Sequence, residues 1–248
     1  MMKKSLFTLA AVAASSSTAM AVIEITVDNV ITAVGDTSTA SNVAPVGGAT
    51  ADYQLDLFDT VTSSSSTGYL RVELNSFSTT LTNHRIDDGQ GNPDNVGISV
   101  GGDSPYEASY TFSFFDDNTF TNPLLLDSFV VQIADIDLVE KVTVSQTDFD
   151  SVAFLSPTDL SLDSSGGQFA VTNAVGENVT KTNPVAVANF NSIANISAFG
   201  VTLEGTDSGS PREFQFDFTG SIVPEPSAYA LLVGLSVLGF IVTRRRTK

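Results

Sequence analysis

The chain has 248 residues, enough for one sizeable core, with 28 acidic residues against 11 Lys and Arg and no Cys or Trp. Without Cys there is no disulfide, no thiolate chemistry and no lipidated cysteine anchor. Six basic residues lie at the two ends, so the segment from Glu24 to Glu225 holds 28 acidic and five basic side chains, a formal charge of −23. This charge repels phosphate backbones, which excludes nucleic acid as a partner, and it attracts divalent cations.

Residues 1–21 have the three parts of a secretory signal peptide. A basic pair at positions 3 and 4 precedes an apolar run over 6–14, which is too short to span a bilayer. Small residues follow at Ala19 and Ala21, with the spacing that signal peptidase prefers. We expect export and cleavage after Ala21, so residues 1–21 are left out of the predicted fold.

Residues 22–222 form the body and predict an all-β fold, an antiparallel β-sandwich or jelly roll. Short runs of β-branched and aromatic residues are separated by Gly, Pro, Asn, Asp and Ser, which indicates about ten to twelve strands and no long amphipathic helix. In 213–218 the alternation predicts three phenylalanines facing the core and Glu213, Gln215 and Asp217 facing solvent. The segments 63–66 and 101–105 are predicted to be exposed loops. The clearest predicted strands are 22–27, 69–74, 110–115, 129–133, 142–144, 152–155, 168–171, 199–203 and 213–218.

The acidic loop from 87 to 95 is the first candidate metal site. Its side chains supply carboxylate and amide oxygens within a Gly-containing loop, the hard ligands and flexible backbone that Ca²⁺ prefers. The spaced acidic order and the distal Glu of an EF-hand are missing. A solvated turn is the alternative interpretation. The candidate ligands are Asp88, Asn92, Asp94 and Asn95.

Asp135 and Asp137 are the second candidate for Ca²⁺. Their spacing predicts two carboxylates on one face of a strand, about 7 Å apart, with Glu140 close behind. The same pair also fits solvent-facing edge charges that prevent aggregation. The acidic segment 116–118 follows an aromatic run and is predicted to be a hairpin turn. Ca²⁺ is the one cofactor that these patterns suggest.

Catalysis is not predicted. The chain has a single histidine, His84, in a polar context that predicts a loop, and it contains no nucleophile motif or metal-ligand spacing. A pair of carboxylates is sufficient for glycoside hydrolysis. This chain has many carboxylates, so their presence does not distinguish a hydrolase from a non-catalytic protein. A hydrolase acting on an extracellular polysaccharide therefore stays a less favoured alternative.

The C-terminal end predicts a single transmembrane helix. Residues 228–243 carry no charge, and a basic cluster, Arg244, Arg245 and Arg246, follows at once. A helix of this length reaches about 24 Å, slightly less than a hydrocarbon core of about 30 Å. The positive-inside rule places the arginines in the cytoplasm and everything before Pro224 outside.

The sequence Val223-Pro224-Glu225-Pro226, followed by the apolar run and the arginines, resembles the PEP-CTERM sorting signal of Gram-negative bacteria that make exopolysaccharide. The resemblance covers 223–248, about a tenth of the chain. It implies recognition by exosortase, a transpeptidase-like membrane enzyme, and cleavage near the Pro-Glu-Pro element. Two prolines keep this segment extended, the conformation that suits a protease-like site.

These patterns together predict an exported protein that passes through an inner-membrane intermediate to the cell surface or the extracellular matrix. We expect a non-catalytic structural or adhesive role linked to exopolysaccharide. The expected partners are an exosortase-like enzyme, the membrane and an extracellular polysaccharide. The alternative is a carbohydrate-binding module assisted by Ca²⁺.

Overall fold

The computed structural model describes residues 23–34, 44–60, 63–87, 95–173, 175–176, 183–193, 195–206 and 211–222. The predicted signal peptide over 1–21 and the predicted sorting signal over 223–248, with its expected transmembrane helix, lie outside these residues and stay predictions. Within them, no helix has the length and apolar character needed to cross a membrane. The strands are β1 Ile23–Val34, β2 Thr50–Asp59, β3 Ser64–Phe77, β4 Leu81–Asp87, β5 Val96–Gly102, β6 Tyr106–Phe115, β7 Leu126–Ala134, β8 Glu140–Ser145, β9 Phe149–Phe154, β10 Leu160–Asp163, β11 Gln168–Asn173, β12 Ala188–Ser192, β13 Ala198–Gly205 and β14 Arg212–Ile222, with a 3-10 turn η1 at Pro184–Ala186.

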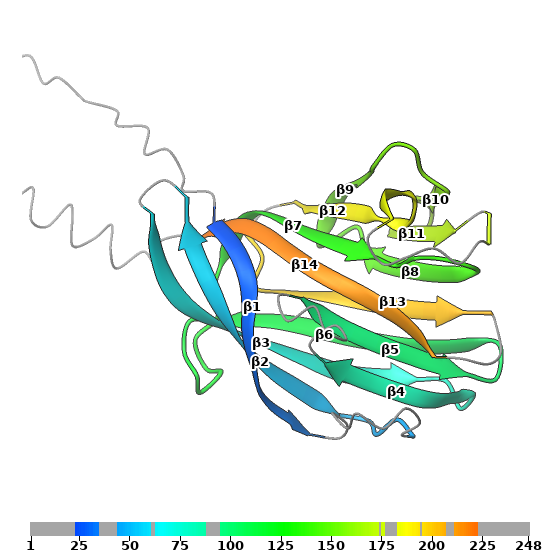
Figure 1. The fold of residues 1–248 in the computed structure, drawn as a ribbon, viewed down its shortest axis with the longest axis horizontal. Helices are drawn as coiled ribbons and strands as arrows, with labels where there is room; N and C mark the ends of the chain where they lie inside the picture. Colours follow the sequence, from blue (N-terminus) through cyan, green and yellow to red (C-terminus); the bar gives the residue numbers. More distant parts are fainter. Residues whose placement is uncertain are drawn as a thin grey trace, which may run out of the picture.

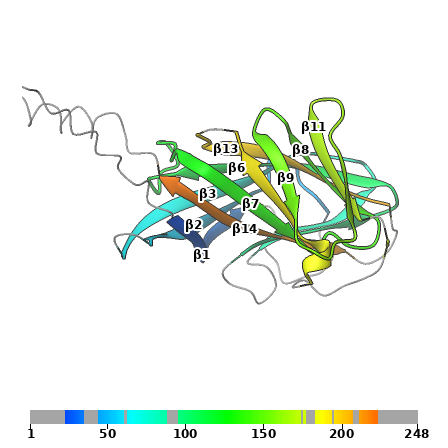
Figure 2. The same ribbon diagram turned by 90° about the horizontal axis from the view of Figure 1, so that it is seen from above.

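The fourteen strands form one antiparallel sheet that folds into two layers (Figures 1 and 2). In the first, which we call the β6 layer, the order is β10-β11-β8-β13-β6-β3-β2. In the second, the β14 layer, β14 pairs with β5 and β7, β5 also pairs with β4, and β7 continues through β12 to β9. Strand β1 joins the layers, because it pairs with β2 on one side and with β14 on the other. The predicted antiparallel sandwich is confirmed.

Phenylalanine rings hold the two layers together. Phe112 of β6 lies 4.8 Å, centroid to centroid, from Phe199 in its own layer and 4.8 Å from Phe216 in the opposite one. Phe114, two residues further along β6, is 5.5 Å from Phe218 of β14. Side chains two apart on a strand share a face, so the alternation in β6 and β14 places both sets of rings in the interior. The predicted inward phenylalanines of β14 are confirmed.

The prediction for the opposite face of β14 is only partly right. Gln215 is 4% exposed, and the Glu213 side chain is 9% exposed. Glu213 lies 3.8 Å from the guanidinium of Arg85 on β4. Register aligns Glu213 of β14 with Ser99 of β5, and Ser99 with Arg85 of β4, so Arg85 extends across β5 toward Glu213.

Two segments predicted to be loops, 63–66 and 101–105, lie partly in strands. Ser64 to Ser66 form the exposed start of β3 and pair with the end of β2. Gly101 and Gly102 end β5 and are buried. A Cβ atom on Gly102 would lie 2.0 Å from the carbonyl oxygen of Thr80, so close packing of the backbone explains this glycine.

His84 is also a strand residue. It is 3% exposed within β4, and its ring stacks on Tyr110 with centroids 5.8 Å apart. The polar neighbours of His84 predicted a loop, but β4 pairs with β5, and the alternation of the pleat directs the imidazole inward.

The first and last strands of the body lie side by side. Ile23, where β1 begins, pairs with Gly220, close to the end of β14 at Ile222. We call this the terminal end of the sandwich. At the opposite, distal end, β6, β8 and β14 begin and β5 and β13 finish.

Candidate functional site

A buried carboxyl group closes the interior at the distal end. Glu140, the first residue of β8, is 2% exposed and lies on the inward face with Val142 and Val144. Its Oε2 accepts the backbone N–H of Asp137 at 2.9 Å, and its own N–H donates to the Asp137 carbonyl at 3.0 Å. These two hydrogen bonds close the turn between β7 and β8.

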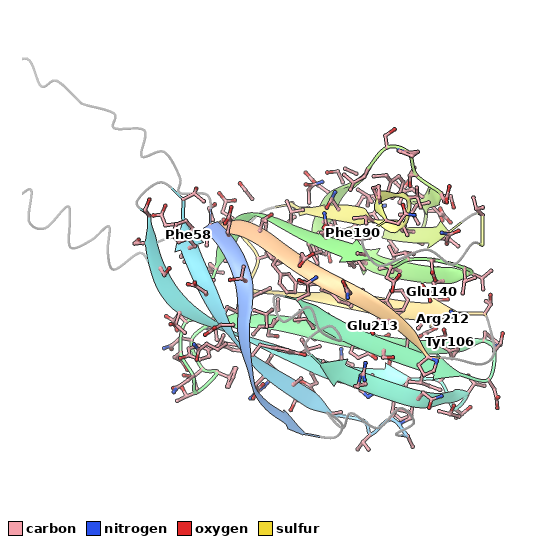
Figure 3. The ribbon with its side chains drawn as sticks, in the orientation of Figure 1. Phe58, Tyr106, Glu140, Phe190, Arg212 and Glu213 are labelled. Atoms are coloured by element: carbon pink, nitrogen blue, oxygen red, sulfur yellow. The ribbon has the colours of Figure 1, made fainter. Side chains whose placement is uncertain are left out.

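Arg212 and Tyr106 complete this group, which we call the distal cluster (Figure 3). Arg212 begins β14 in the opposite layer, and its Nε lies 3.7 Å from Oε1 of Glu140. Tyr106 begins β6, and its ring lies against Gly205 of β13, where a Cβ atom would be 2.2 Å from the tyrosine hydroxyl oxygen. Figure 3 shows Glu140, Arg212 and Tyr106 gathered at one end of the sandwich and Phe58 at the other.

Burial raises the pKa of Glu140 to about 9. The backbone N–H of Asp137 opposes this effect, the charges of Asp137 and Asp135 reinforce it, and Arg212 opposes it. At neutral pH the side chain is therefore a neutral acid. A carboxyl group as buried as that of Glu140 does not contact a polymeric substrate. Its position and its protonated state suit a structural role at the end of the core.

The predicted placement of Asp135 and Asp137 on a strand is wrong. Strand β7 ends at Ala134, and Asp135 has a left-handed backbone, with φ at 68°. Asp137 is 5% exposed and packs with Glu140, so it is not a solvent-facing edge charge. Across the ranges that the structure describes, no three His, Cys, Asp or Glu side chains are grouped to hold a metal ion.

Three ligands of the candidate calcium loop, Asp88, Asn92 and Asp94, lie outside the described residues. The fourth, Asn95, immediately precedes β5 and is 5% exposed. Calcium binding by this loop stays a prediction.

The loop after β6 is organised by Asp117, within the turn that the sequence predicts. Its carboxylate accepts hydrogen bonds from the backbone N–H groups of Thr119, Thr121 and Asn122, and from both threonine hydroxyls. These bonds, chiefly that of the Thr119 hydroxyl, hold the pKa of Asp117 well below its usual value. The contacts are complete at neutral pH and are lost only as the pH falls through the depressed pKa.

This loop brings Phe120 onto the outer face of the β6 layer. The guanidinium carbon of Arg71 lies 4.2 Å from the centre of the Phe120 ring. Arg71 is itself held by Asp52, with two N–O distances of 2.7 and 2.8 Å. The sequence signal for this arrangement is the Asp-x-Thr-x-Thr spacing after Asp117, because short hydroxyl side chains favour such local bonds.

Replacing Asp117 by asparagine is expected to loosen this loop, because the amide retains one acceptor oxygen and loses the charge. Amide hydrogen exchange at Thr119, Thr121 and Asn122 should become roughly tenfold faster at neutral pH. Asp116→Asn, at the exposed neighbouring position, is the matched control and should leave these rates unchanged. Equal rates in D117N and the wild type would contradict the role of the carboxylate.

No protein-family model and no curated protein matches this chain. Among solved structures, the N-terminal domain of a Streptococcus gordonii adhesin aligns with 84% of this chain at 12% identity and a TM-score of 0.46. The chain spans 64% of the length of that domain. The adhesin domain of PrgB from Enterococcus faecalis aligns with 81% of this chain and 88% of its own, at 8% identity and a TM-score of 0.33. A family 11 carbohydrate-binding module of a Clostridium thermocellum cellulase aligns with 78% of this chain and 98% of its own, at 12% identity and a TM-score of 0.20. Likenesses at this distance do not define a shared function.

Proposed function

We propose that the chain is an exported, non-catalytic protein of the cell surface or extracellular matrix, delivered there by its C-terminal sorting signal. The observation that carries this proposal is the order of parts in 223–248, namely the Pro-Glu-Pro element, the uncharged run and the arginine cluster. Each part has a physical role. The prolines present an extended segment for cleavage, the apolar run enters the bilayer, and the arginines fix its direction.

The arrangement of the body supports the same proposal. Because Ile23 pairs with Gly220 and β14 ends at Ile222, the signal peptide and the sorting signal join the sandwich at its terminal end. A body joined to the membrane there leaves its outer sheet faces and its distal end free for the matrix.

The distal cluster gives a reason to favour a non-catalytic body over a hydrolase. Glycosidases need two carboxyl groups that flank a substrate in an accessible cleft. Asp137 and Glu140 are 5% and 2% exposed, the Glu140 carboxylate accepts the Asp137 N–H, and the Glu140 N–H donates to the Asp137 carbonyl. They stabilise a turn of the fold.

Delivery is tested by fractionating cells of a strain that makes exopolysaccharide. We expect the wild-type protein at the cell surface, and we expect retention in the inner membrane when the exosortase-like enzyme is deleted. Combined replacement of Pro224 and Pro226 by alanine should cause the same retention, because the segment loses its fixed extended backbone.

Pro211→Ala is the matched control, since it removes an exposed proline outside the motif. This variant should reach the surface as the wild type does. Normal delivery of the Pro224 and Pro226 double variant, or of the wild type in the deletion strain, would contradict the proposal.

A further inference from the structure

Three large apolar side chains are exposed at the terminal end of the sandwich. Phe58 lies near the end of β2 and is 37% exposed. Leu125, just before β7, is 40% exposed, and Ile193, just after β12, is 51% exposed. Figure 3 shows Phe58 at the opposite end of the sandwich from the distal cluster. A single exposed apolar side chain needs no explanation, but these three lie at the end where the chain is expected to enter the membrane.

Strand register places two of these side chains close to the last residue of β14. Phe58 and Thr219 of β14 both pair with the second residue of β1. Neighbouring strands are about 4.8 Å apart and a strand rises about 3.3 Å per residue, so the Cα atoms of Phe58 and Ile222 are about 14 Å apart. Leu125 is closer, because its neighbour Leu126 pairs directly with Ile222.

The connection between the body and the membrane is short. Strand β14 ends at Ile222 and the uncharged run begins at Ala228, so only the five residues 223–227 join them. Five residues extend at most about 18 Å, and each headgroup layer is at least about 5 Å thick. The end of β14 therefore lies no more than about 13 Å outside the headgroups. The sandwich is several strands wide at this end, so a small tilt brings part of it into the headgroup layer.

Charge and tethering define the surface that this end fits. Glu24 and Asp127 pair with residues 219 and 221 of β14, and their charges repel an anionic lipid surface more than a zwitterionic one. The covalent connection gives the body and the bilayer an effective concentration on the order of millimolar, so the contact needs little affinity of its own. Removal of the exposed apolar side chains from water supplies that affinity.

We propose that the terminal end of the sandwich rests on the bilayer while the chain is held in the membrane, with Phe58 and Leu125 among the lipid headgroups. The partner is a lipid surface of low net charge. The distal end then points away from the membrane. The inference rests on the proposed function, because the predicted C-terminal run supplies the attachment.

The lack of tryptophan makes this contact measurable. Phe58→Trp and Leu125→Trp each introduce a single tryptophan into the chain. Each full-length variant is reconstituted into phosphatidylcholine vesicles with and without bromine on the acyl chains, because bromine quenches tryptophan fluorescence at short range. We expect brominated lipid to remove at least about half of the fluorescence of both variants, since side chains at an interface lie about 5 to 10 Å deep in the boundary between headgroups and acyl chains.

Phe77→Trp is the matched control. Phe77 is 38% exposed, close to the value for Phe58, but it pairs with Ala108 near the start of β6, at the distal end. F77W should lose less than about a tenth of its fluorescence, because its side chain lies far outside the interfacial layer. Quenching of F77W equal to that of F58W and L125W, or no quenching of F58W and L125W, would overturn the inference.

Flotation of the vesicles separates failure of the inference from failure of the proposed function. A chain that does not float with the vesicles contradicts membrane insertion, on which both rest. A chain that floats while F58W and L125W stay unquenched keeps its proposed attachment and contradicts only the contact. Far-ultraviolet circular dichroism shows that each variant is folded, and two independent probe positions keep the test valid if one of them disturbs the fold.

Discussion

Replacing Phe112 by alanine is expected to lower the free energy of unfolding by about 3 to 5 kcal/mol. The Phe112 side chain is fully buried and lies within 4.8 Å, centroid to centroid, of Phe199 in its own layer and of Phe216 in the other. Its removal leaves a cavity between the layers, and the surrounding strands are too constrained by their ladders to fill it. Chemical denaturation followed by circular dichroism measures the effect.

Phe77 provides the matched control for this prediction. It is a phenylalanine on a strand of the same layer, but it is 38% exposed. Phe77→Ala should therefore lower the free energy of unfolding by less than about 1 kcal/mol. Equal losses in F112A and F77A would show that the rings between the layers do not dominate the core.

Replacing Glu140 by glutamine is expected to remove a pH dependence of stability. The native state holds the proton of Glu140 more tightly than the unfolded state does, because burial raises its pKa from 4.5 to about 9. The free energy of unfolding of the wild type should therefore decrease as the pH rises from about 5 to about 9, by up to about 1.4 kcal/mol per pH unit from this group.

In E140Q the side-chain carbonyl oxygen still accepts the N–H of Asp137, but no ionisation follows. The variant should be more stable than the wild type at pH 8 and close to it at pH 5. Glu107→Gln removes an exposed carboxylate on β6 and serves as the control, which should keep the wild-type slope. Denaturation curves at several pH values measure the slopes, and an unchanged slope in E140Q would contradict the buried, protonated state.

Alternation of apolar and polar residues predicts strands β6 and β14, but the equally regular strand β2 is not among the predicted strands. In β6 and β14 every second residue is aromatic or apolar, and these strands lie where the pattern places them. Strand β5 is buried along its whole length, and only Gly and Ser separate Val96, Ile98 and Val100, so it lacks the polar positions that mark a half-buried strand. Strand β4 contains Asn, His and Arg, which resemble a loop until β5 pairs with it and the pleat directs His84 inward.

The candidate sites depend on contacts that a sequence does not display. Glu140 and Arg212 begin strands in different layers, and they meet only because the sheet folds onto itself. The left-handed backbone of Asp135 breaks the alternation on which its predicted strand placement rested. The outward series of hydroxyl residues along β6 is visible in the sequence, whereas its alignment with Thr202 of β13 is set by strand register.

We propose that the protein reaches the cell surface through a sorting signal that is then removed. Intact-mass spectrometry of the protein released from the cell surface tests it most directly. We expect a chain that begins at Val22 and ends near the Pro224-Glu225-Pro226 element, and a longer chain ending at Lys248 when the exosortase-like enzyme is absent. A surface form that ends at Lys248 in both strains would contradict it.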